Sequence, residues 1–374
     1  MLKEFSVTNF KNFKEKTVFQ LDKPASYEFN AEIIQNGIVT KGIIYGINGC
    51  GKSNLALAIF DIVLHLTDKN KSLDKYQLYL NLDSQKKEAD FEYAFEFNGI
   101  EVIYRYTKTD PLTLLNESLT IAGKEVLNYD FLRKTGYTSL AGAEKLPLSS
   151  SLSTNSEKLS RVKYINSNAI LQDTEENHAF VSFTSFVDNM LMFYSLNENR
   201  YQGLCVGIDS YTQGIVREGK EKEFESFLRN HGVYYNLVGV EVNGQKDLFC
   251  SFRNSTVPFA LIASTGTKSL ALFYYWYLKM KEATFVFIDE YDAFYHFELS
   301  QALVELVKQL SNTQVFLSTH NTDLISNDIL RPDAYFEIQN NSISSFDKKT
   351  EKELRRAHNI QKMYKAGSFN EKIN

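Results

Sequence analysis

The segment Gly46-Ile47-Asn48-Gly49-Cys50-Gly51-Lys52-Ser53 fits the pattern G-x-x-x-x-G-K-[ST] at every position. It follows the compact apolar run Gly42-Ile43-Ile44-Tyr45, and from Lys52 onward the sequence has helical composition and period. Glycines let a backbone curl until successive N–H groups point inward, and a following helix adds the positive end of its dipole. The order of strand, glycine loop and helix therefore predicts a cradle for the phosphates of ATP, with a chance glycine turn as the alternative.

Two side chains of this loop have predicted roles of their own. Lys52 is expected to neutralise the β- and γ-phosphates, and the hydroxyl of Ser53 is expected to ligate Mg²⁺. The residues expected to hold the nucleotide here are Gly46, Asn48, Gly49, Cys50, Gly51, Lys52, Ser53 and Asn54.

A second motif, Thr284-Phe285-Val286-Phe287-Ile288-Asp289-Glu290, is an apolar strand that ends in two acids. At the carboxyl end of a strand beside the loop, Asp289 is expected to hold Mg²⁺ through water. Glu290 is expected to act as the general base that positions the attacking water. An apolar run closing on Asp-Glu also occurs by chance, so this prediction depends on the glycine loop upstream.

Two further segments are candidates for phosphate contacts. Gln314-Val315-Phe316-Leu317-Ser318-Thr319-His320 is another apolar strand, whose terminal His320 is expected to contact the γ-phosphate; a structural histidine is the alternative. Ser264-Thr265-Gly266-Thr267 opens a helix, where a serine hydroxyl and N–H groups suit a phosphate. In isolation this second segment is a helix cap.

Together with the start Phe5-Ser6-Val7-Thr8-Asn9-Phe10-Lys11-Asn12-Phe13, these motifs resemble, in order, those of the ABC-like ATPases related to SMC proteins and to the OLD family. The resemblance implies an α/β fold: an ABC-ATPase-like mixed sheet with a P-loop, an antiparallel β unit and an inserted helical subdomain. It also implies that Ser264, with Gly266 in the same loop, reaches ATP bound by a second subunit. Two ATP molecules would then be sandwiched in a head-to-tail homodimer, and a higher assembly stays open.

The tail from Ser318-Thr319-His320-Asn321 to Met363-Tyr364-Lys365-Ala366-Gly367-Ser368-Phe369 is similar to the stand-alone ATPases of bacterial anti-phage systems, of the PARIS and Septu types. That resemblance implies a separate effector partner, a nuclease or toxin. Tyr295-His296-Phe297 keeps only the histidine of the family's leucine-histidine-proline run, which puts a D-loop-like role for Asp292 or His296 in doubt. Gln85 is a weak candidate for a Q-loop glutamine, with a solvated loop as the alternative.

Composition agrees with a protein that stays in the cytoplasm. The chain has 374 residues and a net charge of −5, with no apolar run near the ~20 residues of a membrane span and no signal peptide at its start. Cys50, Cys205 and Cys250 lack metal-site spacing, so we expect reduced thiols. The net charge argues against bulk electrostatic coating of nucleic acid, although a local DNA contact stays open.

The pattern of elements divides the chain into three parts. Residues 1–127 are expected to hold the P-loop and the antiparallel β unit, with a hairpin turn at Asn98-Gly99. Residues 128–232 are expected to be an inserted, mainly helical subdomain that contains the serine-rich loop Ser149–Ser156. Residues 233–374 are expected to complete the ATPase domain with the signature loop, the acidic pair, His320 and the tail.

Functions of different classes fit this sequence to different degrees. The first is an ATP-hydrolysing regulatory subunit of an anti-phage system, whose dimer closure controls an effector. The alternative is a DNA-repair or chromosome-associated ATPase, which usually needs long helical arms or a basic groove. A nuclease in its own right is disfavoured because only about fifty residues follow His320, and a transporter ATPase has a different signature loop.

Overall fold

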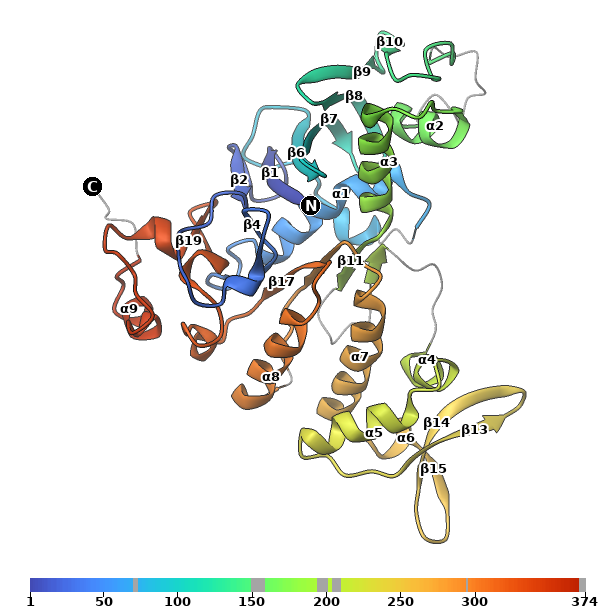
Figure 1. Cartoon of the computed structure of the whole chain (residues 1–374), viewed down its shortest axis with the longest axis vertical. Coiled ribbons are helices and arrows are strands. Elements are labelled where there is room, and N and C mark those ends of the chain that lie inside the picture. Colours follow the sequence, from blue (N-terminus) through green and yellow to red (C-terminus); the bar gives the residue numbers. More distant parts are fainter. Residues whose placement is uncertain (70–72, 149–158, 194–200, 204–209, 294, 370–374) are drawn as a thin grey trace.

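The chain folds around a seven-stranded central sheet (Figure 1). The P-loop follows β5 (Lys41–Tyr45), an inner strand of this sheet. The computed structural model describes residues 1–69, 73–148, 159–193, 201–203, 210–293 and 295–369, so Ser149–Ser156 and Cys205 lie outside the described residues. Five neighbouring strands of this central sheet are parallel, and both edge strands are antiparallel. Their order is β12 (Tyr201–Gly203), β11 (Met190–Phe193), β16 (Phe285–Ile288), β17 (Gln314–Ser318), β5 (Lys41–Tyr45), β18 (Tyr335–Gln339) and β19 (Ser342–Ser345).

Helix α1 (Lys52–Leu66) begins directly after the P-loop and lies between the two large sheets of the molecule. Phe60 packs against Phe285 of the central sheet, with ring centroids 6.0 Å apart. On its other side, the hydroxyl of Tyr93, in the second large sheet, donates to the carbonyl oxygen of Ala58 at 3.0 Å. Burial on both sides explains why the helix is apolar almost all round.

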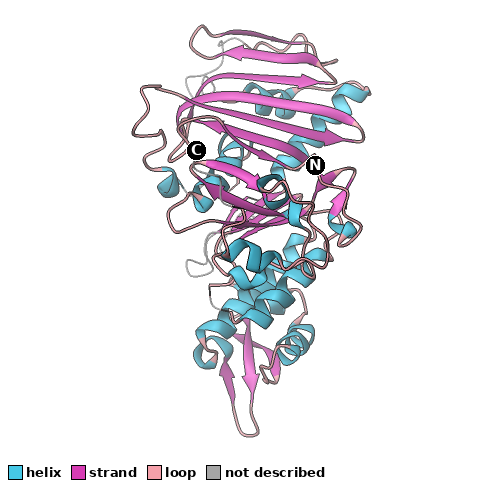
Figure 2. Cartoon of the chain, turned by 90° about the vertical axis from the view of Figure 1, so that its left-hand side faces the viewer, coloured by secondary structure: helices cyan, strands magenta, loops and turns pink. Residues whose placement is uncertain are grey.

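The second large sheet is entirely antiparallel and forms one end of the molecule (Figure 2). Asn98 and Gly99 both have positive φ in the turn between two of its strands, which confirms the expected hairpin. Gln314 of β17 joins the two sheets, because its amide accepts from Leu2 N at 2.7 Å and donates to Leu2 O at 2.9 Å. The strand order is β10 (Thr135–Thr138), β9 (Lys124–Asp130), β8 (Thr113–Ile121), β7 (Ile100–Asp110), β6 (Ala89–Phe97), β1 (Leu2–Thr8) and β2 (Thr17–Gln20).

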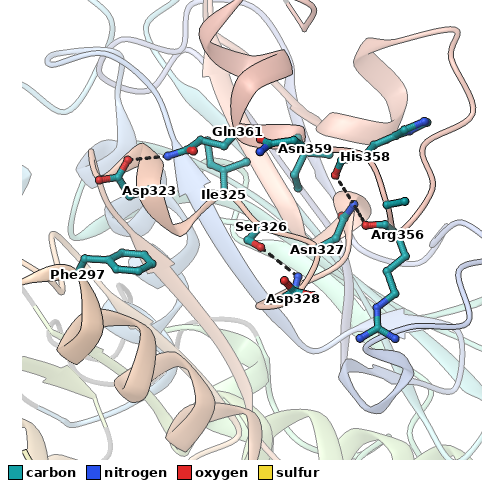
Figure 3. Close-up of a pocket in the computed structure, with 12 residues that line it drawn as sticks. Phe297, Asp323, Ile325, Ser326, Asn327, Asp328, Arg356, His358, Asn359 and Gln361 are labelled. Carbon is teal, nitrogen blue, oxygen red and sulfur yellow. Dashed lines mark hydrogen bonds between the residues drawn. The ribbon is translucent and has the colours of Figure 1, made fainter.

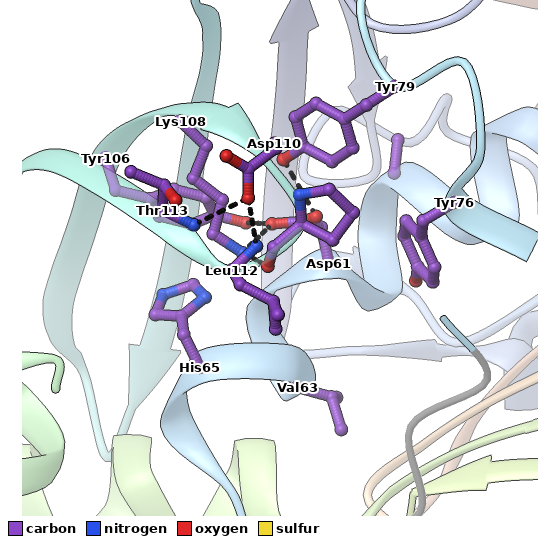
Figure 4. Close-up of polar contacts among 12 residues, drawn as sticks. Asp61, Val63, His65, Tyr76, Tyr79, Tyr106, Lys108, Asp110, Leu112 and Thr113 are labelled. Atoms are coloured by element: carbon purple, nitrogen blue, oxygen red, sulfur yellow. Dashed lines mark hydrogen bonds and ion pairs between the residues drawn. The ribbon is translucent and has the colours of Figure 1, made fainter. Parts of the chain in front are cut away.

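A fully buried ion pair fastens α1 to this antiparallel sheet (Figure 4). Lys108 Nζ donates to Asp61 Oδ1 at 2.6 Å, and the hydroxyl of Tyr106 donates to the same oxygen at 2.9 Å. The second oxygen, Oδ2, accepts from the Tyr79 hydroxyl at 2.9 Å. Burial raises the pKa of Asp61, and the Lys108 charge opposes that shift. The ion pair between Asp61 and Lys108 thus holds α1 against the antiparallel sheet, and replacing either residue removes it.

Replacing Lys108 by methionine is expected to destabilise the fold by about 3–5 kcal/mol, because it leaves the Asp61 carboxylate buried without its counter-charge. The double variant Asp61→Asn/Lys108→Met is expected to lose less, since neither charge remains. Urea unfolding of both variants measures the difference. Equal losses in the single and the double variant would contradict a role for the charge pair.

A small lobe forms the opposite end of the molecule from the antiparallel sheet (Figure 2). It consists of a three-stranded sheet in the order β13, β14, β15, with short helices around it. Its elements are α4 (Tyr211–Arg217), α5 (Glu221–Asn230), β13 (Leu237–Val242), β14 (Gln245–Ser251), β15 (Thr256–Pro258) and α6 (Phe259–Ile262). Helix α7 (Thr265–Met280) connects this lobe to the central sheet (Figure 1).

The expected fold class is confirmed: the chain is α/β, with a mixed sheet behind the P-loop and a separate antiparallel unit. The division at residues 127 and 232 remains a prediction, and the strands do not follow it, because β9 and β10 complete the antiparallel sheet while β11 joins the central one. The other strands and α-helices of the described residues are β3 (Ile34–Gln35), β4 (Ile38–Val39), α2 (Arg161–Asn168), α3 (Glu175–Asp188), α8 (Phe297–Lys308) and α9 (Ile360–Lys365). Over the described residues, none of the helices has the length and apolar character that crossing a membrane requires.

Candidate nucleotide site

The P-loop adopts a backbone that only glycine supports at two of its positions. Gly46 and Gly51 have φ of 150° and 112°. A side chain at Gly46 would collide with the Cys50 sulfur, and one at Gly51 would collide with the amide of Asn12. Gly51 also N-caps α1 without a side-chain hydrogen bond. The first N–H groups of the helix are therefore not capped by that residue, as a phosphate site requires.

The central sheet brings the separate motifs to one place. Strands β16, β17 and β5 are parallel neighbours, so the residues after them meet at the same edge of the sheet. The hydroxyl of Ser53 donates to Asp289 Oδ2 at 2.5 Å. Lys52 Nζ lies 3.4 Å from His320 Nδ1 and donates to the carbonyl oxygen of Gly46 at 2.9 Å. Four predicted site residues thus form one cluster.

Ser318, which the sequence did not single out, positions both members of the acidic pair. Its hydroxyl donates to Asp289 Oδ1 at 2.5 Å and accepts from the backbone N–H of Glu290 at 2.9 Å. Glu290 has a φ of 47°, in the left-handed region that a glutamate seldom adopts. In the sequence, the one feature that points to this contact with the acidic pair is the position of Ser318 at the end of an apolar strand, just before Thr319 and His320.

Asn12 is a second residue that the motifs did not identify. Its amide Nδ2 donates to the carbonyl oxygen of Cys50 at 3.2 Å, and its Oδ1 accepts from Asn54 Nδ2 at 2.7 Å. The same Nδ2 donates to Asn341 Oδ1, in the turn between β18 and β19, at 3.0 Å. Asn12 therefore ties the P-loop and the start of α1 to the N-terminal hairpin. Asn12 lies in the segment Asn9–Phe13, which contributes to the resemblance to ABC-like ATPases, but this position alone does not predict its contacts.

Burial lowers the pKa values of Lys52 and His320, and neighbouring charges modify each shift. Burial is the largest cause that lowers the pKa of Lys52, while the neighbouring Asp289 and Glu290 charges oppose it. Burial and then the Lys52 charge lower the pKa of His320, which keeps the imidazole neutral near pH 7. Bound anionic phosphates would oppose these shifts for both groups, because an opposite charge favours the protonated form.

The side chains present fit magnesium and a triphosphate. Mg²⁺ prefers oxygen ligands, and the Ser53 hydroxyl lies against the carboxylate of Asp289. Lys52 supplies a cation within the same loop, and the helix N-terminus supplies N–H donors. Ser53 and Asp289 would hold the metal, which would neutralise charge on the phosphate oxygens when bound.

The structure does not bring Ser264 and Gly266 to this cluster. The Ser264 hydroxyl caps α7, accepting from Thr267 N at 3.2 Å, and the residue is exposed. Helix α7 has 16 residues and is about 24 Å long, and Ser264 lies at the end that joins the small lobe (Figure 1). A contact of Ser264 with ATP on a second subunit remains a prediction.

Asp292, His296 and Gln85, whose roles the motifs leave open, have defined surroundings. Asp292 accepts from the Thr319 hydroxyl at 2.7 Å, next to His320, and burial raises its pKa. His296 N-caps α8 through its carbonyl oxygen, which accepts from Ser300 N at 3.0 Å. Gln85 is exposed in a loop.

A separate hollow of about 450 Å³ lies beside the tail (Figure 3). Asn327 shapes it, because its Nδ2 donates to the carbonyl oxygens of Arg355, Arg356 and His358 at 3.0–3.2 Å. Gln361 closes another part by donating to Asp323 at 2.6 Å. None of the residues expected to bind nucleotide lines this hollow.

One segment of the chain is similar to a known protein family. Residues 210–326 match a family model described as "AAA domain, putative AbiEii toxin, Type IV TA system". This segment is therefore similar to part of a AAA domain. The matched segment includes Ser264, Asp289, Glu290 and His320 but not the P-loop itself. No curated protein matches the chain.

Several solved structures are similar over most of their length. An SMC head bound to the C-winged helix domain of ScpA is 14% identical, covers 93% of this chain and 99% of its own, and has a TM-score of 0.48. The SMC head domain from Thermotoga maritima is 16% identical, with coverage of 92% and 97% and a TM-score of 0.43. The recombination mediator RecF with ATP is 12% identical, with coverage of 92% and 98% and a TM-score of 0.37.

Proposed function

We propose that this chain is the ATP-binding and ATP-hydrolysing regulatory subunit of a bacterial anti-phage defence system. In this proposal, ATP closes a head-to-tail dimer, and the closed dimer holds or controls a separate effector such as a nuclease. The observation that carries the ATPase part is the meeting of Lys52, Ser53, Asp289 and His320 at one edge of the central sheet.

Each residue of the cluster has a task in hydrolysis. Lys52 binds the β- and γ-phosphates, and Ser53 with Asp289 would hold Mg²⁺, which would neutralise phosphate charge. Glu290 accepts the proton of the water that attacks the γ-phosphate, while ADP leaves with its β-phosphate oxygen bound by the P-loop. His320, neutral before binding, donates a ring N–H to the γ-phosphate and so distinguishes ATP from ADP.

The exposed position of Ser264 supports a dimer with two shared sites. A helix N-terminus is a favourable place for an anion, and this one lies far from the P-loop of its own chain. A second copy in head-to-tail orientation would bring each Ser264 to the other copy's ATP. Closure would then depend on nucleotide, which is the property that a regulatory switch needs.

Replacing Ser264 by arginine is expected to block closure while ATP binding by the monomer stays within about twofold of the wild type. The long cation would occupy the space of the partner's phosphates, whereas the P-loop is untouched. Light scattering with and without Mg²⁺-ATP measures closure, and nucleotide titration measures binding. The matched control is Ser255→Arg, at an exposed serine of the same lobe. ATP-dependent dimerisation of Ser264→Arg at wild-type strength would contradict the shared site.

The defence role is supported by the description of the matched family model, which names a putative toxin of a toxin–antitoxin system. It is tested by phage challenge of bacteria that express the chain with its adjacent genes, comparing the wild type with Glu290→Gln. Protection that needs both an active ATPase and a neighbouring gene supports the proposal. ATP-dependent binding of duplex DNA by the chain alone, without any protection, would favour a DNA-repair role instead.

A further inference from the structure

Strand β13 is an edge of the three-stranded sheet, and its outer side carries backbone groups without partners. Ser251 N donates to Asn236 O at 2.8 Å, so in the regular register that follows, even-numbered residues of β13 bond to β14. The N–H and C=O groups of the odd-numbered residues therefore point away from the sheet. The first of these outward groups, the N–H of Leu237, donates to the Glu225 carboxylate at 2.7 Å. Among the described residues, no hydrogen-bond partner is found for the outward groups of Gly239 and Glu241.

This edge lacks the features that usually protect an exposed strand. Edge strands are commonly blocked by lysine, proline or a bulge, because a bare edge is a template for another strand. The run Val238-Gly239-Val240-Glu241-Val242 has none of these and only one charge. An open hollow of about 540 Å³ borders its first part, lined by Glu221 and Lys222 of α5, residues 236–239 and Ser251 of β14. The described part of the chain therefore leaves room beside the edge.

The side chains of β13 are complementary to a second copy of themselves. Antiparallel pairing through the outward groups places Gly239 opposite Glu241 of the second copy, so the two Glu241 side chains do not face each other, although Glu221 and Val216 lie against the side-chain face of Gly239. The same register places Val240 opposite Val240 of the second copy, and Val238 opposite its Val242. These valines share one face of the strand and are half-buried or exposed, with Val242 46% exposed. Pairing would extend their apolar stripe across the interface.

We propose that β13 is a nucleotide-independent self-association edge, on which a second copy of this chain adds its own β13 in antiparallel register centred on Val240. The two small sheets would become one six-stranded sheet across a twofold axis. This contact is distinct from the ATP-dependent closure at Ser264, because it uses β13 of the small lobe and needs no phosphate. Together the two contacts would link closed dimers into a larger assembly.

The proposed register can be tested at Val240, because this residue would lie opposite Val240 of the second copy. In the absence of nucleotide, analytical ultracentrifugation at tens of micromolar protein is expected to show a dimer for the wild type. Val240→Lys and Val240→Glu are each expected to weaken association by at least about tenfold, since each places like charges directly opposite. An equimolar mixture of the two variants is expected to associate again. Circular dichroism and thermal unfolding verify that each variant is folded.

Three results would overturn this proposal: a wild type that stays monomeric without nucleotide, single charge variants that associate like the wild type, or a mixture that fails to recover. Glu241→Pro is a second variant that removes an outward N–H while leaving the bonds to β14 intact, and it should also dissociate the dimer. Lys52→Ala should associate normally. That control separates failure of this edge from failure of the ATP-dependent switch.

Discussion

Replacing Lys52 by alanine is expected to lower the affinity for Mg²⁺-ATP by about 100-fold. The ammonium group lies in the P-loop, where it donates to the Gly46 carbonyl oxygen, and Lys52 is the first residue of α1, whose N-terminus would receive phosphate. A hydrogen bond to a charged group contributes about 1.5–3 kcal/mol, and each 1.4 kcal/mol is a factor of ten. Isothermal titration with a non-hydrolysable ATP analogue measures the loss.

The control for Lys52→Ala is Lys352→Ala, which removes an exposed lysine from the tail. The control is expected to bind like the wild type, and thermal unfolding of both variants verifies that they fold. If Lys52→Ala binds the analogue with unchanged affinity, the loop from Gly46 to Ser53 is not the phosphate site.

Replacing Glu290 by glutamine is expected to lower kcat for ATP hydrolysis by about 10²–10⁴-fold, which is the usual contribution of a general base. The amide keeps the size of the side chain and cannot accept the proton of the attacking water. Binding is expected to persist, because Lys52, Ser53 and Asp289 are unchanged. The variant should therefore accumulate as a closed dimer with ATP. Steady-state phosphate release and light scattering measure the two effects.

Glu298→Gln is the matched control, since Glu298 is an exposed glutamate in the first turn of α8, a few residues after Glu290. It is expected to hydrolyse ATP at the wild-type rate. Turnover by Glu290→Gln close to that of the control would remove Glu290 as the base and leave the acidic pair with a metal-binding role alone.

The motifs were predictable from sequence because the fold uses a simple rule of parallel sheets. Each of the three motifs follows an apolar strand, and the carboxyl ends of parallel neighbours meet at one edge. Lys52, Asp289 and His320 therefore meet although they are up to 268 residues apart. To predict this cluster from sequence, it was sufficient to know each residue's type and its position directly after an apolar strand.

The residues that support the site could not be predicted in the same way. Asn12 and Ser318 act through contacts with distant parts of the chain, and neither carries a pattern that names its partner. The same holds for Asp61 and Lys108, whose pairing follows from how α1 packs on β7. Strand β11 is short, and nothing in its sequence specifies that it lies beside β16. These features depend on tertiary packing rather than on local pattern.

The most direct measurement is a crystal structure of the Glu290→Gln variant with Mg²⁺ and ATP. We predict that Lys52 Nζ contacts the β- and γ-phosphates, that the Ser53 hydroxyl ligates the metal, and that Asp289 lies beside it with His320 near the γ-phosphate. A triphosphate bound elsewhere, with Lys52 and Asp289 contacting neither nucleotide nor metal, would contradict the account.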